Sequence, residues 1–357
     1  MTTLFSPLTL GSLEVPNRIF MAPLTRCRAE PGDVPGDLIA TYYAQRASAG
    51  LLIAEATMAI ANNCAFMGAP GIHSDAQVAG WRKTTDAVHR AGGRIYLQIW
   101  HGGRACHSLL NGGAQPVAPS PIAIGIGEIY TPEGPKPYET PRALRDDEIP
   151  GVVEGFRRAA ENARRAGFDG VEIHGANGYL LDQFLRDGSN SRSGPYGGSL
   201  ANRARLMLEV VDAAAGVFGH GRVGLRISPL NGYNDMKDSA PLELTRYLCE
   251  QLSPRGLSYL HVMRADFLGQ QHGDVLSVAR RAFKGPLVAN MGYAPDEAAQ
   301  AVESGAVDAI AFGTLFLANP DLPARIEAKS PLNAPDRSTF YAGGAKGYTD
   351  YPALSVS

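Results

Sequence analysis

Residues 168–187, FDGVEIHGANGYLLDQFLRD, decide the fold and the site of this chain. Their first half, GVEIH, is a short apolar run with β-branched residues, which is typical of a strand buried on both faces. The run ends at a glycine, and YLLDQFL then starts a helix. His174, Asn177 and Tyr179 lie at this transition, where two intervening glycines permit a tight backbone path. Three polar side chains can converge there on one small ligand, so we predict that the active site lies at this turn.

The same three residues also have a purely structural interpretation. A single histidine at a strand end is more often part of a satisfied core than a catalyst. Asn177 could simply be a turn residue, and Tyr179 could be a core aromatic on the helix. The three together are more specific than any one of them, and the way the pattern repeats along the chain favours the functional interpretation.

A strand followed by a helix recurs eight times. The predicted strands cover residues 18–23, 51–56, 94–99, 170–174, 223–228, 259–263, 286–292 and 309–313. Apolar residues at helical spacing follow each strand, as with Val78, Trp81, Thr85 and Val88. Apolar strands that alternate with amphipathic helices indicate a parallel sheet covered by helices. Eight such units favour an α/β fold closed into a (β/α)8 TIM barrel, with a doubly wound open sheet as the alternative.

Two segments depart from this repeat. Leu8 to Pro16 alternates apolar and polar residues around a Gly-Ser pair, which predicts a small hairpin that plugs one end of the barrel. Residues 102–146 are rich in Gly and Pro and are far longer than an ordinary strand-to-helix loop. We expect them to form a lid or hairpin insertion over the barrel mouth, with a floppy insertion as the alternative. Residues 1–357 are expected to be one domain that carries this insertion.

Composition excludes several classes of function. The 33 basic and 35 acidic residues leave no charge excess, which argues against nucleic acid or an acidic membrane surface as partner. The four cysteines are far apart and form no CxxC motif, as expected for free thiols in a reducing compartment. The N-terminus has no signal-peptide pattern, and no run approaches the roughly 20 apolar residues of a membrane span. We therefore expect a cytoplasmic protein. The sequence leaves both a monomer and a homodimer open.

In a barrel of this type the chemistry lies at the carboxyl ends of the strands. Those ends form a polar collection with one cation and no carboxylate cluster: Pro23 to Thr25, Ala56, Gln98 to Trp100, His174, Arg226 to Ser228, Asn290 to Gly292, Gly313 and Thr314. A metal site would need several His, Asp or Glu residues together, so we predict none. Arg226 needs a negative partner, either an anionic ligand or a structural carboxylate such as Glu55 or Glu172.

The seventh and eighth predicted strands end in the glycine-bearing turns ANMGYAPDE and FGTLFLANPD. Backbone N–H groups in such turns can cradle a phosphate. No GxGxxG motif follows a strand, so the chain has no Rossmann site for a dinucleotide. The inferred ligand has a phosphate, a polarisable head and stacking partners such as Trp100 and Tyr348. Flavin mononucleotide (FMN) fits this description.

The chain resembles the Old Yellow Enzyme family of FMN-dependent ene-reductases nearly from end to end. The motifs are APLTR at 22–26, EAT at 55–57, GAPGIHS at 68–74, QIWHGGR at 98–104, EIHGANGYLLDQFL, LRISP and AGGAKGYTDYP, and their joint order is very specific. The resemblance implies a (β/α)8 barrel with FMN held non-covalently at its mouth. It also implies NADPH or NADH as reductant and a small electrophilic alkene as substrate: an enone, enal, maleimide or nitroalkene. Nitroaromatic compounds and nitrate esters are alternative substrates on the same scaffold.

The resemblance also implies roles for single residues. His174 and Asn177 would donate hydrogen bonds to the carbonyl or nitro oxygen of the substrate as charge develops there. Hydride would pass from flavin N5 to the β-carbon, and Tyr179 would protonate the α-carbon. Phe66, Trp100 and Tyr348 would complete the substrate pocket.

On the cofactor side, the resemblance places Thr25 at the flavin C4 carbonyl, Gln98 at the pyrimidine edge and Arg226 at the N1 and C2 region. The remaining cofactor contacts would come from Pro23, Leu24, Ala56, Asn290, Met291, Gly292, Phe312, Gly313 and Thr314.

Several positions differ from the family pattern. Thr314 stands where much of the family has an arginine on the FMN phosphate, and Lys284 or Arg26 could supply the missing charge. Phe66 replaces a usual tyrosine and makes one pocket wall less polar. Asn177 stands where some relatives have a second histidine, and Thr25 rather than cysteine indicates the branch with a threonine-tuned flavin.

Two other classes of function remain as alternatives. A phosphate-binding barrel lyase or isomerase would need a lysine or carboxylate at a strand end, and none is evident. A non-catalytic flavin-binding protein is suggested by the missing arginine at Thr314.

Overall fold

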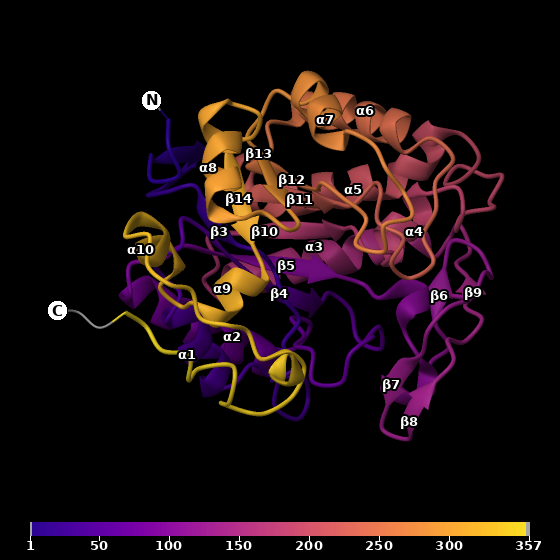
Figure 1. Cartoon of the computed structure of the whole chain (residues 1–357). Coiled ribbons are helices and arrows are strands. Elements are labelled where there is room, and N and C mark those ends of the chain that lie inside the picture. Colours follow the sequence, from indigo (N-terminus) through magenta and orange to yellow (C-terminus); the bar gives the residue numbers. More distant parts are fainter. Residues whose placement is uncertain (1, 355–357) are drawn as a thin grey trace.

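The computed structural model describes residues 2–354, and its centre is a closed barrel of eight parallel strands (Figure 1). Around the barrel the order is β10-β11-β12-β13-β14-β3-β4-β5. The strands are β3 (Ile19–Met21), β4 (Leu52–Met58), β5 (Ile95–Trp100), β10 (Gly170–Gly175), β11 (Val223–Ile227), β12 (Tyr259–Met263), β13 (Leu287–Asn290) and β14 (Ala309–Phe312). The predicted barrel is confirmed, and the open sheet is wrong.

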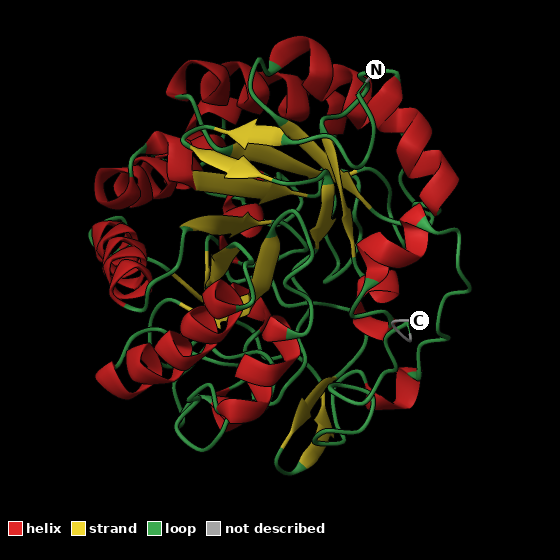
Figure 2. Ribbon diagram, turned by 90° about the vertical axis from the view of Figure 1, so that its left-hand side faces the viewer, coloured by secondary structure: helices red, strands yellow, loops and turns green. Residues whose placement is uncertain are grey.

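Helices form an outer ring around the strands (Figure 2). They are α1 (Asp37–Ala44), α2 (Asp75–Arg90), α3 (Ile149–Arg165), α4 (Leu180–Leu185), α5 (Leu200–Phe218), α6 (Pro241–Leu252), α7 (Val275–Ala282), α8 (Pro295–Glu303), α9 (Thr314–Ala318) and α10 (Leu322–Glu327). Short 3-10 turns add η1 (Gly103–Ala105), η2 (Ser108–Leu110), η3 (His220–Arg222), η4 (Ser253–Arg255) and η5 (Arg337–Thr339).

The helix α2 illustrates why these segments fold as they do. Ser74 accepts a hydrogen bond from the backbone N–H of Gln77, whose side chain binds back to the backbone of Ser74, so a capping box begins the helix. Val78, Trp81 and Val88 recur at helical spacing and are buried against the barrel. Local sequence and burial thus agree on the same element.

The predicted hairpin closes the amino-terminal end of the barrel. β1 (Leu8–Leu10) pairs with β2 (Leu13–Val15) in antiparallel register. Leu10 and Leu13 belong to a buried cluster with Phe20, Tyr96 and Tyr259 from the barrel strands. This apolar plug leaves the carboxyl ends of the strands as the open mouth.

The insertion after β5 carries the expected hairpin. β7 (Ile129–Thr131) pairs with β8 (Gly134–Lys136) in antiparallel register, and β6 (Val117–Ala118) pairs with β9 (Arg142–Ala143) in parallel. The hairpin projects at the lower right of Figure 1. The insertion is therefore built from paired strands, at the side of the barrel mouth.

Residues 2–354 lack two features that would indicate a membrane or a metal ion. No helix there is both long enough and apolar enough to cross a bilayer. Within the same residues, His, Cys, Asp and Glu side chains form no group of three that could hold a metal ion.

We predict that Leu10→Ala lowers the free energy of unfolding by about 2–5 kcal/mol, because a fully buried leucine is lost from the plug. Urea unfolding followed by circular dichroism measures the change. Thr9→Ala, at an exposed position in the same strand, is the control and should change stability little. Equal effects of the two substitutions would show that the hairpin does not pack as a plug.

Candidate active site

His174 is a neutral hydrogen-bond donor at the end of β10. Its ring is buried, and Nδ1 accepts a hydrogen bond of 3.3 Å from the backbone N–H of Ala176. An acceptor role for Nδ1 places the proton on Nε2. Burial lowers the pKa of His174 well below its usual value, and the positive charges of Arg226 and His261 lower it further. The imidazole therefore stays uncharged and offers one N–H.

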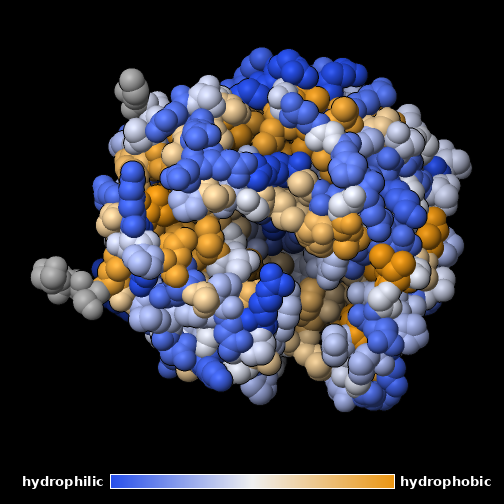
Figure 3. Space-filling view, viewed as in Figure 1, coloured by the Kyte–Doolittle hydropathy of each residue, from blue (hydrophilic) through white to orange (hydrophobic). Residues whose placement is uncertain are grey.

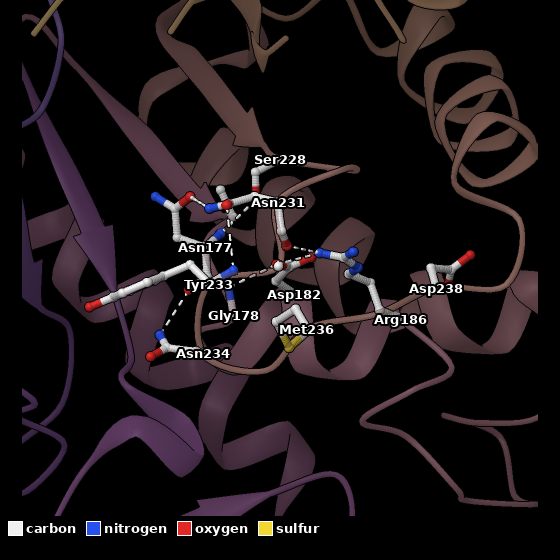
Figure 4. Close-up of polar contacts among 12 residues, drawn as sticks. Asn177, Gly178, Asp182, Arg186, Ser228, Asn231, Tyr233, Asn234, Met236 and Asp238 are labelled. Carbon is white, nitrogen blue, oxygen red and sulfur yellow. Dashed lines mark hydrogen bonds and ion pairs between the residues drawn. The ribbon is translucent and has the colours of Figure 1, made fainter. Parts of the chain in front are cut away.

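Asn177 is held by three hydrogen bonds from the loop after β11 (Figure 4). Its backbone N–H donates to Ser228 Oγ at 2.7 Å, and Asn234 Nδ2 donates to its backbone carbonyl at 2.9 Å. Asn231 Nδ2 donates to the side-chain oxygen of Asn177 at 2.9 Å. With its oxygen engaged, Asn177 presents its amide NH2 on the side away from Asn231. Its φ of 57° is in the left-handed region, which asparagine tolerates better than most residues.

Tyr179 lies directly before α4 and contacts both His174 and Trp100. Its ring is edge-on to Trp100 at 4.6 Å and to His174 at 5.0 Å between centroids. Burial raises the pKa of Tyr179 well above its usual value, and neighbouring tyrosines, Tyr233 first among them, raise it further. The phenol therefore keeps its proton at neutral pH. The structure thus brings His174, Asn177 and Tyr179 together on one turn.

A cavity of about 660 Å³ opens beside this turn. Figure 3 shows the face hollowed near its centre and toward the β7–β8 hairpin. The lining comes from the turn, the insertion, the loop after β11 and the C-terminal segment: Cys27, Ala65, Phe66, Met67, Ala105, Glu128, Ile129, Tyr130, Tyr138, Tyr179, Tyr233, Asn234, Ser338, Tyr341 and Ala342. Of the predicted substrate residues, Phe66 and Tyr179 line the cavity directly. Trp100 contacts both of them from behind.

The prediction that Tyr348 contacts the ligand is wrong. Its ring is fully buried and stacks on Tyr42 at 4.0 Å, with the guanidinium of Arg26 at 4.9 Å from its centroid. This stack fastens the C-terminal segment to α1. Tyr341, seven positions earlier in the sequence, lines the cavity instead and stacks on Phe66 at 6.0 Å.

Neither cation proposed to replace the missing arginine at Thr314 is suitable. Arg26 is buried and donates to the carbonyls of Phe340 and Gly347 and to the hydroxyl of Tyr42. Lys284 donates to the carbonyl of Arg281, at the amino-terminal side of β13 and so at the opposite end of the barrel. Both expectations are corrected by the structure.

Glu172 is the structural carboxylate near Arg226. It accepts from Gln98 Nε2 at 2.8 Å and lies 2.9 Å from Nδ1 of His261, all inside the barrel. Burial lowers the pKa of Arg226, and the charge of Glu172 opposes that shift. Glu55, the other carboxylate considered, accepts from the backbone N–H of Arg26 instead.

Unpaired buried atoms at this end of the barrel fit a flat polar ligand. Within residues 2–354, Nε of Arg226, Nε1 of Trp100 and Oδ1 of Asn290 have no hydrogen-bond partner. Such groups are costly unless a ligand or water satisfies them. β13 then leads into Met291 at φ 92° and Gly292 at φ 70°, an irregular turn at the same mouth. The site therefore suits FMN, with donors and acceptors for its ring and a turn for its phosphate.

The predicted cofactor residues surround this same mouth. Pro23, Leu24 and Thr25 follow β3 and Ala56 lies in β4. Phe312 ends β14, and Gly313 and Thr314 follow it. Sequence reasoning missed the cavity tyrosines Tyr130, Tyr138, Tyr233 and Tyr341. Only Tyr341 had a sequence signal, because it directly precedes the motif AGGAKGYTDYP.

Comparison with known proteins agrees with this geometry. The model of the NADH:flavin oxidoreductase / NADH oxidase family matches residues 3–333. A probable flavin mononucleotide-dependent alkene reductase of Leishmania infantum is 48% identical over 356 residues, 98% of this chain and 97% of that protein. The 12-oxophytodienoate reductase 1 of Oryza sativa subsp. japonica is 45% identical over 360 residues, 98% of this chain and 93% of its own.

Solved structures give the same result. Morphinone reductase superposes with a TM-score of 0.96 at 48% identity, over 99% of this chain and 96% of that one. The old yellow enzyme from Trypanosoma cruzi has a TM-score of 0.96 at 45% identity, over 99% of both chains.

The chain therefore belongs to the NADH:flavin oxidoreductase / NADH oxidase family, and its Old Yellow Enzyme resemblance is confirmed. The family match also confirms the predicted oxidoreductase class, the FMN cofactor, the nicotinamide reductant and the reduction of activated alkenes. The lyase or isomerase alternative is wrong.

We predict that Glu172→Gln raises the flavin midpoint potential by roughly 30 mV or more, about 1.4 kcal/mol for a two-electron couple. Reduced flavin carries more negative charge than oxidised flavin, and Arg226 without its carboxylate would stabilise that charge more strongly. A dye-equilibration titration measures the potential. Glu55→Gln, which removes a carboxylate that faces Arg26 instead, should shift it much less. An unchanged or lower potential in Glu172→Gln would contradict this electrostatic account.

Proposed function

We propose that His174 and Asn177 bind the oxygen of the activating carbonyl or nitro group of the substrate. Both present N–H donors from one turn, and both are fixed before the substrate arrives, His174 through Ala176 and Asn177 through Asn231. Preorganised donors stabilise negative charge as it develops on that oxygen, which withdraws electrons from the conjugated alkene. FMN, when bound and reduced, supplies a hydride for the β-carbon.

The proton for the α-carbon comes from Tyr179 in this proposal. The phenol is on the same turn as both donors and faces the cavity. Its raised pKa keeps it protonated, so it can act as a general acid at neutral pH. Hydride and proton then arrive at adjacent carbons, and the phenolate regains its proton from solvent. The position of Tyr179 beside His174 at the cavity is the single observation that carries this assignment.

The insertion is proposed as a lid. Glu128, Ile129, Tyr130 and Tyr138 reach the cavity from it, so the insertion forms part of the cavity wall. Covering the reacting atoms excludes water and strengthens the hydrogen bonds to the substrate oxygen. A cavity of about 660 Å³ can admit enones, enals, maleimides or nitroalkenes, and the nicotinamide of NADPH or NADH in alternation with them. We place this activity in the cytoplasm.

One cuvette experiment tests the activity. The purified protein is expected to show flavin absorbance that bleaches with NADPH under anaerobic conditions and returns on addition of cyclohexenone. A flavin-binding protein without catalysis would keep its colour with NADPH or fail to regain it with cyclohexenone.

We predict that Tyr179→Phe leaves flavin reduction by NADPH nearly unchanged and slows alkene reduction by about two orders of magnitude. The substitution removes the acidic proton and keeps the ring against Trp100. Stopped-flow absorbance separates the two half-reactions. Tyr138→Phe, which removes another cavity phenol, is the control. Normal oxidation of the reduced variant by cyclohexenone would exclude Tyr179 as the acid.

The phosphate site is proposed to rely on backbone donors. Thr314 is exposed at the start of α9 and carries no charge. Arg264 contacts the turn after β13, but its guanidinium donates to the carbonyl of Met291 at 2.8 Å and pairs with Glu297. FMN is thus expected to be held less tightly than it would be with an arginine at the end of β14.

We predict that Thr314→Arg tightens FMN binding by about fivefold, the worth of one partly exposed charge pair. Fluorescence titration of the apoprotein measures the dissociation constant. Riboflavin, which lacks the phosphate, should bind wild type and variant alike, and Thr314→Gln should leave FMN affinity near the wild-type value. Equal FMN affinity in Thr314→Arg and wild type would place the phosphate elsewhere.

A further inference from the structure

A buried ion pair lies behind the turn that carries Asn177 and Tyr179. Asp182 of α4 and Arg186, the residue that follows α4, are almost completely buried, with Oδ2 and Nη1 at 3.9 Å. Neither residue lines the cavity, and neither can touch a substrate there. The chemistry described above leaves both without a role.

Each member of the pair holds one side of the substrate-binding turn (Figure 4). Asp182 Oδ2 accepts a hydrogen bond of 2.8 Å from the backbone N–H of Gly178, the residue between Asn177 and Tyr179. Arg186 Nη1 donates to the carbonyl of Asn231 at 2.7 Å. Asn231 in turn donates to the side-chain oxygen of Asn177. Two chains of contacts thus run from one buried pair to the same turn.

The turn is also packed too closely to tolerate displacement. Gly178 has a φ of 72°, and a Cβ there would lie 2.7 Å from side-chain atoms of Asn234 and Met236. Backbone and loop are therefore in contact at this point, and a small shift of either moves both neighbouring side chains. Such a site requires neighbouring residues that hold its side chains precisely in place.

Stability alone does not explain this pair. Burying two charges costs more free energy than a well-packed apolar pair of similar size, and such replacements are often neutral or stabilising. An apolar pair could not accept a hydrogen bond from the Gly178 N–H or donate one to the Asn231 carbonyl. The hydrogen bonds, rather than the charges, distinguish this pair from an apolar one.

We propose that Asp182 and Arg186 are positioning residues that hold the Asn177 amide and the Tyr179 phenol in the geometry for binding and protonating the substrate. This inference rests on the function proposed above. Asp182 fixes the turn directly through Gly178, and Arg186 fixes the orientation of the Asn177 amide through Asn231.

The charge on Asp182 gives this support a pH dependence. Burial raises the pKa of Asp182 to about 6. The charged groups that face it are Arg186 directly after α4, Arg104 on η1 and Asp238 in the loop after β11. Arg203 of α5 lies 3.6 Å from Asp238. As pH falls through 6, protonation weakens the acceptor for Gly178, so affinity for an enone should fall.

The first test compares Asp182→Ala with Asp187→Ala. Asp187 directly follows Arg186 and accepts from the backbone N–H of Ser239 at 3.1 Å, outside the two chains of contacts. The dissociation constant of the oxidised, FMN-loaded protein for cyclohexenone is measured from the change in flavin absorbance. We expect Asp182→Ala to weaken binding about tenfold, the worth of a buried hydrogen bond, with KM raised likewise. Asp187→Ala should bind like wild type, and both should keep the wild-type flavin potential.

A second variant covers the case in which Asp182→Ala does not fold. Asp182→Asn keeps an acceptor for the Gly178 N–H and removes the charge. The affinity of this variant for cyclohexenone should therefore be nearly constant between pH 5 and 7. The affinity of the wild-type protein should decline below pH 6. Wild-type affinity in Asp182→Ala, or the same pH profile in wild type and Asp182→Asn, would overturn the proposal. Failure of the proposed function is distinct, since wild-type protein itself would then not bind cyclohexenone or oxidise with it.

Discussion

The parallel pairing of β10 with its two neighbours is the constraint on which the site depends. Its register sets His174 beside Arg226 on β11, and Glu172 beside Gln98 on β5. Because alternate residues of a strand face the same side, a shift of β10 by one residue would turn His174 and Glu172 out of the barrel, away from Arg226 and Gln98. The closed barrel leaves no free edge along which such a shift could start. The positions of these four polar side chains at the site thus depend on the strand pairing.

The surroundings of His174 and Tyr179 keep each of these two side chains in one protonation state near neutral pH. His174 is buried near Arg226, which keeps the imidazole neutral, while burial keeps the phenol of Tyr179 protonated. One residue therefore donates an N–H without carrying charge, and the other holds a proton it can release. The amino-terminal end of the barrel is filled by Leu10 and Leu13, and the two phenols of that cluster, Tyr96 and Tyr259, are buried with raised pKa values.

Sequence alone was sufficient for the features that depend on local pattern. Eight apolar strands with helical periods after them defined the barrel, and the Gly-Ser pair defined the hairpin. His174, Asn177 and Tyr179 lie within six residues at one strand end, so their proximity required no tertiary information. The family motifs added the cofactor.

What sequence could not resolve was which of two similar residues reaches the cavity. Tyr341 and Tyr348 lie in one irregular segment, and only the stack of Tyr348 on Tyr42 determines which ring is buried. Lys284 is different, because it directly precedes the predicted strand 286–292, so its place at the amino-terminal end of the barrel already followed from the sequence. Tyr138 and Tyr233 arrive from an insertion and a loop whose paths are set by contacts distant in the chain.

In the proposed mechanism, the turn that carries His174, Asn177 and Tyr179 both binds the substrate oxygen and supplies the proton. A crystal structure of the FMN-loaded protein with cyclohexenone tests it most directly. We expect Nε2 of His174 and Nδ2 of Asn177 both to lie within about 3.2 Å of the carbonyl oxygen, with the Tyr179 hydroxyl facing the α-carbon. A carbonyl oxygen bound away from both nitrogens, or a Tyr179 hydroxyl turned from the alkene, would contradict it.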